Sequence, residues 1–169
     1  ILLDLWVKTG DARYERFARF WTRLFAVTFA VGVAPGIVLE FQFGTNWATY
    51  SRFVGDVFGS PLAAEAVFAF FLESSFLAVL VFGWGRVSPR MHLFAAIMVC
   101  LGAHLSAVWI VVANSWQQTP TGYELVVTEA GRVRAEITDF WAMVWNPSTG
   151  DRLSHVFTGA WQEASWMVI

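Results

Sequence analysis

The chain contains four apolar stretches, and each is about as long as an α-helix that crosses a bilayer. They cover residues 20–43, 62–84, 91–114 and 153–169, against the roughly 20 apolar residues that a spanning helix needs. The opening residues ILLDLWV have the composition of a helix that ends there. The pattern predicts an all-α, polytopic transmembrane helix bundle of about four spans plus the tail of a preceding one. Apolar runs at both ends lead us to expect a fragment of a longer membrane protein.

Polar segments separate these stretches. Turn residues and aromatics in 44–60 predict a short interfacial helix or loop, and the short loop at 85–90 requires its two flanking helices to be antiparallel. Residues 115–151 form a long connection of mixed charge, with a predicted hairpin whose turn is at 129–132. Pro35 removes a backbone hydrogen bond and is expected to kink the first span.

Composition places the chain in the membrane class. Hydrophobic residues make up 57% of it and charged residues only 14%, with a mean hydropathy of +0.54, whereas charge alone is near 25% in soluble domains. The net charge of −2 gives no basic surface for nucleic acid. The lipid bilayer is therefore the expected surrounding, and nucleic acid is not an expected partner.

Lysine and arginine counts predict the orientation, because these residues concentrate in cytoplasmic loops. The side that holds 8–19, Arg23 and 85–90 has seven of them, and the opposite side has four. Residues 8–19 and 85–90 are therefore predicted to be cytoplasmic, and 115–151 to be an extracytoplasmic loop.

Two carboxylates, Glu65 and Glu73, interrupt the second apolar stretch. At 100° per residue in an α-helix, their spacing of eight puts them about 80° apart on one broad face. An ionisable group at such depth costs about 2.5 kcal/mol or more on insertion scales. The carboxyls are either structural hydrogen-bonding groups or members of a proton relay. In the second case Ser74 and a polar stripe formed by Ser106 and Asn114 would bridge the gaps.

Histidines are the other candidates for chemistry. His155 lies near the start of the last stretch and is either an interfacial histidine or an axial ligand of a heme, since neutral imidazole is the usual proximal donor to heme iron. His104 lies within a span and is expected to hydrogen-bond to another helix or to serve a proton or cofactor role. His92, at a helix start, is expected to be a juxtamembrane residue.

Several motifs in order resemble subunit I of the cytochrome bd-type quinol oxidases. They are EFQFGTNW from residue 40, FVGDVFG from residue 53, PLAAE from residue 61, FFLES from residue 70, LSAVWI from residue 105, ANSW from residue 113, and Asn146-Pro147 ahead of His155. The resemblance implies a fragment that covers roughly helices two to five of that subunit.

The resemblance implies a function. In that family quinol is oxidised, electrons pass through a low-spin b heme to a high-spin b heme and then to heme d or a second high-spin b heme, and dioxygen is reduced to water. His155 matches the ligand of the low-spin heme iron, and Glu65, Glu73, Ser74 and Ser106 match the proton pathway. A second membrane subunit and a bacterial or archaeal cytoplasmic membrane are implied as well. The fragment alone is expected to be inactive, because other heme ligands and the quinol-binding loop lie outside it.

Three positions depart from the pattern of the family. Gly85 stands where many members carry Asp, His104 where a small polar residue is usual, and Glu163 where the span is usually less polar. Two readings outside the family stay open at this point. One is a heme-free proton- or cation-coupled transporter whose buried acids bind the coupling ion, and the other is a purely structural subunit.

Overall fold

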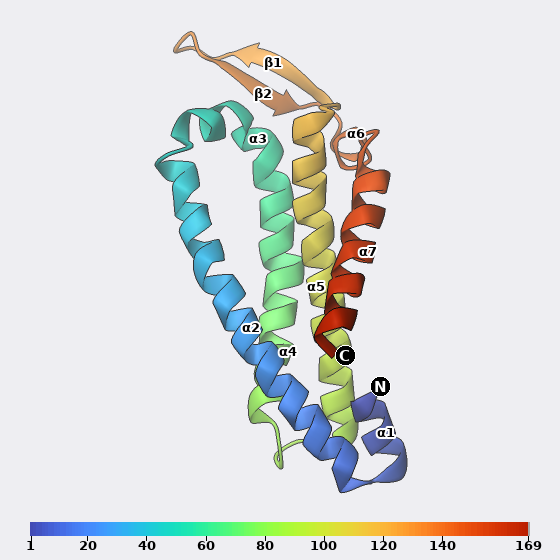
Figure 1. Ribbon diagram of the computed structural model, residues 1–169. Coiled ribbons are helices and arrows are strands. Elements are labelled where there is room, and N and C mark those ends of the chain that lie inside the picture. The colour runs from blue at the N-terminus through green and yellow to red at the C-terminus, as the bar shows by residue number, and fades with distance from the viewer. Residues whose placement is uncertain (169) are drawn as a thin grey trace. The chain divides into compact units, whose positions relative to one another are not determined.

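The computed structural model describes residues 1–168; Ile169, the last residue of the predicted fourth span, lies outside the described residues. Helices form most of the chain, which confirms the predicted all-α class (Figure 1). The elements in order are α1 (Leu2–Thr9), α2 (Ala12–Gly44), α3 (Ala48–Ala64), a π-helix (Glu65–Phe70), α4 (Phe71–Phe82), α5 (Pro89–Gln118), β1 (Tyr123–Val127), β2 (Val133–Ile137), α6 (Phe140–Val144) and α7 (Thr149–Val168).

The chain divides into two compact units. The first unit comprises Ile1–Ala48 and Ala66–His104, and the second comprises Thr49–Glu65 and Leu105–Ile169. The division falls inside the helix that carries both acidic residues and inside α5.

Three helices of the described residues are long and apolar enough to cross a bilayer. They are α2, the continuous helix Ala48–Phe82 that joins α3 to α4, and α5. α7 has 20 residues but carries Asp151, Arg152 and Glu163, and it is not one of the three. The fourth span and the limits of the others within the bilayer stay predictions.

In the first unit, α1 folds back on α2, and a small apolar core lies between α4 and α5. Its buried members are Leu77, Leu80, Ala95 and Val99, and side chains of α1 and α2, Leu3 and Phe29, pack against them. Helix α2 continues past Pro35 to Gly44.

The N-terminus of α2 is capped by the side chain of Asp11, which accepts a hydrogen bond of 2.8 Å from the backbone N–H of Arg13. The Arg13 side chain also donates to this carboxylate and lowers the pKa of Asp11. The cap therefore keeps the negative charge that a helix N-terminus favours.

The helix Ala48–Phe82 differs from expectation in two ways. The segment predicted at 44–60 is not separate from the next helix, because α3 starts at Ala48 and runs through Pro61 to Ala64 with one face buried in the core. The turn from Glu65 to Phe70 is a π-helix, so the assumed rotation of 100° per residue does not hold between the two acids. The π-helix begins one turn after Pro61, whose missing N–H leaves the Val57 carbonyl without its α-helical donor.

In the second unit, α3, the end of α5, the hairpin and α6 share one core. Its buried residues are Val54, Val57, Phe58, Val112, Ala113, Trp116, Ala135, Met143 and Val144. The predicted hairpin is confirmed, with β1 antiparallel to β2 and Val127 opposite Val133. It is tied to α3 by a 2.8 Å hydrogen bond from the Ile137 N–H to the Asp56 carboxylate.

A buried polar network joins the end of α5 to the start of α7. The Ser115 and Thr119 hydroxyls donate to the Asn146 side-chain oxygen at 2.7 and 2.9 Å, and the Asn146 amide donates to the Met143 carbonyl at 3.1 Å. Thr149, the first residue of α7, donates to the Val144 carbonyl at 2.9 Å. Because Ser115, Asn146 and Thr149 are buried, these bonds fix where α7 begins.

Replacing Asn146 by alanine should lower the unfolding temperature of the solubilised protein. The change removes the oxygen that the Ser115 and Thr119 hydroxyls share as acceptor, at about 0.5–1.5 kcal/mol per lost hydrogen bond, while both hydroxyls keep Ser148 as a partner. The matched control is Asn46→Ala, because Asn46 is exposed and bonds to Gln42 of the preceding turn. Equal unfolding temperatures for the two variants would contradict the role given to the network.

Candidate functional site

Glu65 is bound across two helices of the second unit. It is the first residue of the π-helix and only partly exposed, and its Oε1 accepts a hydrogen bond of 2.8 Å from the Ser106 hydroxyl of α5. The pair is separated by 41 positions in sequence. The predicted partnership of this acid with the polar stripe of the next helix is therefore present as a direct contact.

Glu73 lies in the first turn of α4 and is 8% exposed. It faces Gly102 of α5 in the first unit. A Cβ atom at Gly102 would lie 2.8 Å from the Glu73 Cβ and 3.0 Å from the Glu73 backbone nitrogen, closer than side chains approach. Only glycine at this position allows α4 and α5 to come so close together beside the carboxyl group.

Ser74 and Asn114 have local partners. The Ser74 hydroxyl donates to the Phe70 carbonyl at 2.7 Å, one turn back in its own helix. Asn114 accepts a 3.0 Å hydrogen bond from Arg152 near the start of α7. Of the stripe predicted on α5, Ser106 thus contacts an acid, whereas Asn114 anchors α7.

His155 lies in α7 on a face that is open in the second unit. Its side chain is exposed, and Gly159, one turn further along, has no atom within 4 Å of where a Cβ would stand. The rings of Phe157 and Trp161 stack on the same helix at 6.0 Å. An accessible imidazole with space beside it fits the demand of a flat macrocycle for one axial ligand.

The described residues contain no group of three or more His, Cys, Asp or Glu side chains that could hold a bare metal ion. This does not bear on a heme, because the porphyrin supplies four of the iron ligands and the protein adds only axial ones. The sequence prediction of His155 as an axial ligand stays a prediction.

The three positions that depart from the family pattern have different surroundings. The His104 Nδ1 donates to the Cys100 carbonyl at 2.7 Å, within α5. Gly85 has a left-handed φ of 74° in the loop before α5, a conformation that suits glycine better than aspartate. Glu163 is exposed on α7.

His92 lies in the first turn of α5, at the helix start that the sequence predicted, but its burial was not predicted. Its side chain is completely buried in the first unit, and neither ring nitrogen has a hydrogen-bond partner within residues 1–168. The ring lies against Trp84 at 4.2 Å and Trp6 at 6.1 Å between ring centroids. Sequence offers little signal for this, because Trp6 comes from a helix more than 80 positions away.

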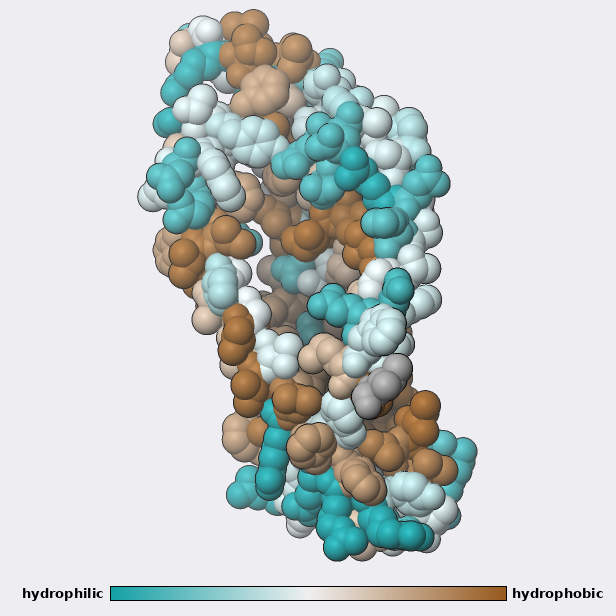
Figure 2. Space-filling view, viewed as in Figure 1, coloured by the Kyte–Doolittle hydropathy of each residue, from teal (hydrophilic) through white to brown (hydrophobic). Residues whose placement is uncertain are grey.

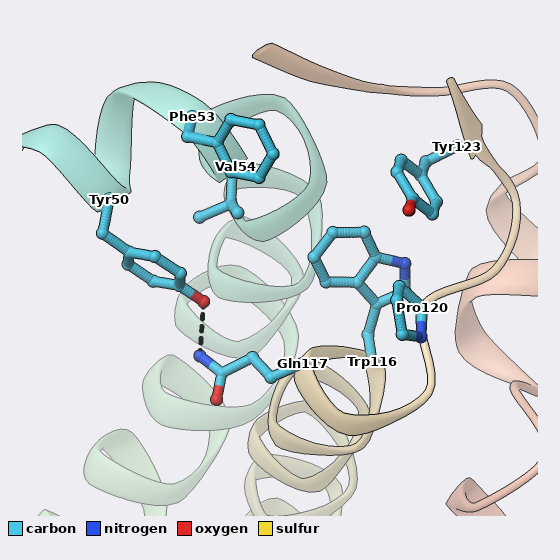
Figure 3. Close-up of a pocket in the computed structure, with 7 residues that line it drawn as sticks. All are labelled: Tyr50, Phe53, Val54, Trp116, Gln117, Pro120 and Tyr123. Atoms are coloured by element: carbon cyan, nitrogen blue, oxygen red, sulfur yellow. Dashed lines mark hydrogen bonds between the residues drawn. The ribbon is translucent and has the colours of Figure 1, made fainter. Parts of the chain in front are cut away.

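A pocket of about 420 Å³ opens in the second unit where α3 meets the end of α5 (Figure 3). The side chains that line it are mostly aromatic: Tyr50, Phe53, Val54, Trp116, Gln117, Pro120 and Tyr123. Gln117 donates to the Tyr50 hydroxyl at 2.6 Å across the pocket. Tyr50 and Phe53, two aromatics of the predicted interfacial segment 44–60, thus form one wall of an amphipathic recess whose lining contains no carboxylate or histidine.

Comparison with known proteins gives consistent matches. The sequence profile described as "Cytochrome bd terminal oxidase subunit I" matches residues 1–169. The chain is 46% identical over 155 residues to cytochrome bd-II ubiquinol oxidase subunit 1 of Escherichia coli (strain K12), covering 92% of this chain and 30% of that one. It is 44% identical over 160 residues to cytochrome bd ubiquinol oxidase subunit 1 of Bacillus subtilis (strain 168), covering 95% and 33%.

A solved structure matches as well. The chain superposes on the bd oxidase of Geobacillus thermodenitrificans with a TM-score of 0.78 and 32% sequence identity, over 92% of this chain and 35% of that one. This chain therefore spans about a third of the length of the relatives that it matches. Since the profile covers every residue, the chain belongs to the cytochrome bd terminal oxidase subunit I family.

Proposed function

We propose that this chain carries the proton pathway and the low-spin heme ligand of a terminal quinol oxidase, which passes electrons from quinol to dioxygen and reduces it to water. The observation that carries the proposal is the hydrogen bond between Glu65 and Ser106, a polar contact between two helices of spanning length in a member of this family. The relatives are named as ubiquinol oxidase subunits, which supports quinol as the electron donor.

The Glu65–Ser106 contact supports proton transfer because of the chemistry of its two groups. A serine hydroxyl donates and accepts at the same time, so it can receive a proton on one side and release one on the other. The Glu65 carboxyl alternates between acceptor and donor as it is deprotonated and protonated. Reduction of dioxygen to water consumes a proton with every electron, and this pair would supply protons at that rate.

Glu73 is proposed as the group that receives protons first. It lies nearer in sequence than Glu65 to the 85–90 loop, which the arginine distribution assigns to the cytoplasm. Gly102 keeps the neighbouring helix close to this carboxyl, so that the carboxyl is buried at 8% exposure. Ser74, which bonds to its own helix, would serve the pathway by turning toward a proton or a water that arrives at Glu73.

His155 is proposed as the axial ligand of the low-spin b heme. Bound there, the heme would supply one-electron transfer between quinol and the oxygen-reducing site. The protein would contribute the neutral imidazole of His155, the open face beside Gly159 and an α7 whose start is fixed by Ser115, Asn146 and Thr149. The high-spin b heme, and heme d or a second high-spin b heme, would be held by the remainder of the subunit.

The proposal includes a location and partners. The subunit would cross the cytoplasmic membrane of a bacterium or archaeon several times, with 8–19 and 85–90 inside and 115–151 outside. α7 would form the fourth span, 153–169 in the sequence prediction, with Glu163 facing the interior of the complete subunit. A second membrane subunit would complete the oxidase, and this chain by itself would not turn over.

Replacing His155 by alanine in the complete protein should remove the low-spin b-type band from the reduced-minus-oxidised visible spectrum, because the iron loses its imidazole. The matched control is His104→Asn, which removes a histidine bonded within α5 and should leave the band in place. A band that persists in His155→Ala would overturn the ligand assignment. A colourless purified protein would instead favour a heme-free transporter.

Replacing Glu73 by glutamine should slow oxygen consumption at least tenfold, since the amide cannot take up and release a proton, a contribution of about 10²–10⁴ for positioned acids and bases. The b heme should still be reduced by quinol. The control is Glu124→Gln, which alters an exposed carboxylate of the hairpin. Full turnover of Glu73→Gln would contradict the relay.

Replacing Gly102 by valine should separate α4 from α5 beside Glu73, because its Cβ alone would lie 2.8 Å from that of Glu73. We expect slower oxygen consumption together with a lower unfolding temperature. Gly55→Val is the control, since no atom lies within 4 Å of a Cβ built there. If Gly102→Val and Gly55→Val behaved alike, the close approach would have no functional part.

A further inference from the structure

Three arginines line one pocket of the first unit. Arg19 and Arg23 come from α2 and Arg86 from the loop after α4, and the pocket has a volume of about 360 Å³. Thr22, Val81, Phe82 and Trp84 complete the lining. The wall thus combines three positive charges and a hydroxyl with apolar surface, and no carboxylate lines it.

The arginines have donors left for a ligand. Arg23 has no ion pair or hydrogen bond to another part of residues 1–168, and Arg86 donates one hydrogen bond, of 3.3 Å, to the Phe82 carbonyl. Arg19 is paired with Glu15 at 3.0 Å. A guanidinium has five N–H donors and matches the geometry of phosphate oxygens with two parallel hydrogen bonds. The pocket therefore has more donors than its own acceptors use.

Contacts with other side chains hold Trp84, which lines the pocket, in place. The Arg19 guanidinium lies 4.7 Å from the centre of the Trp84 ring, and the buried ring of His92 lies 4.2 Å from the same tryptophan. Trp84 is therefore fixed between a cation and an imidazole. A site whose side chains are already ordered loses less entropy when a ligand binds.

Apolar surface adjoins the charged groups. Phe82 is 68% exposed, and Val81 and Trp84 stand beside it. Figure 2 shows hydrophilic residues gathered around the turn between α1 and α2, with hydrophobic residues further along the helices. Arginine and tryptophan at the end of an apolar helix are typical of the headgroup level of a bilayer.

We propose that this pocket binds the phosphate of an anionic phospholipid in the cytoplasmic leaflet, with the arginines on the phosphate and the acyl chains along Val81 and Phe82. Basic pockets between spanning helices on the cytoplasmic side bind such headgroups. Inorganic phosphate is also an anion, but it has no apolar group that could contact Val81 and Phe82. The inference depends on the membrane orientation in the proposed function and not on the oxidase chemistry.

The test uses the complete protein in detergent, titrated with phosphatidylglycerol, phosphatidylcholine or inorganic phosphate. Native mass spectrometry counts bound lipid, and the unfolding temperature reports stabilisation. Phosphatidylglycerol should bind and stabilise the wild type, and R23Q/R86Q should bind it about 25-fold more weakly, at about fivefold per arginine near the membrane surface. R52Q/R132Q, which removes two exposed arginines of the second unit, should behave as wild type.

Each other outcome would overturn the proposal. Equal lipid binding by R23Q/R86Q and R52Q/R132Q would mean that the pocket is not the site, and stabilisation by phosphatidylcholine or inorganic phosphate alone would exclude an anionic lipid as the ligand. If R23Q/R86Q does not fold, R23Q alone, at an exposed position, should weaken binding about fivefold. Heme spectra and oxygen consumption are recorded on the same samples, so that failure of the oxidase proposal is read separately.

Discussion

A carboxyl group inside an apolar helix is costly unless it has a polar partner, and helix packing around one such group is a feature of each unit. In the second unit Glu65 receives a hydrogen bond from Ser106, which requires α3 and α5 to lie side by side at that level. In the first unit Glu73 is covered by α5 at Gly102, where a larger residue would collide with it. An unpartnered charge at such depth would cost several kcal/mol, so these contacts determine how closely the helices pack.

The π-helix is located at one of these two carboxyl groups. Glu65 is its first residue, so the change from the α-helical hydrogen-bond pattern begins at the acid that bonds to Ser106. Pro61, one turn earlier, has already removed a backbone donor from the helix. Single π turns inside α-helices often lie at functional sites, because the extra residue redirects the side chains around them. The irregular turn of this helix therefore begins at Glu65, the residue that the proposed function assigns to the proton pathway.

Buried hydrogen bonds fix the start of α7, the helix that carries His155. Within residues 1–168 the His155 side chain is exposed, and nothing lies within 4 Å of a Cβ built at Gly159, one turn further along α7. What is fixed is the start of the helix, through the buried bonds of Asn146 with Ser115 and Thr119 and the bond from Arg152 to Asn114. In the proposed function, this anchored start and exposed face are where the heme would meet His155.

Sequence alone predicted what depends on local pattern and on single residues that are costly to bury. The hairpin followed from its turn residues, the helices from apolar length, and the contact of Glu65 with the α5 stripe from the cost of an isolated acid. The sequence did not predict features that depend on packing between residues far apart in the chain. His92 is buried because Trp6 and Trp84 cover it, and α3 continues through Pro61 because its apolar face fits the core of the hairpin and α6. The π-helix was not predicted from the sequence, because arguments from periodicity assume a constant rotation per residue.

The most direct test of the central claim is the redox-induced infrared difference spectrum of the complete protein, which detects protonated carboxyl groups by their C=O stretch. If Glu65 exchanges protons while bonded to Ser106, a carboxyl band should change with redox state, shift to higher frequency in Ser106→Ala as the hydrogen bond is lost, and vanish in Glu65→Gln. A difference spectrum with the same carboxyl bands in wild type, Ser106→Ala and Glu65→Gln would contradict the account.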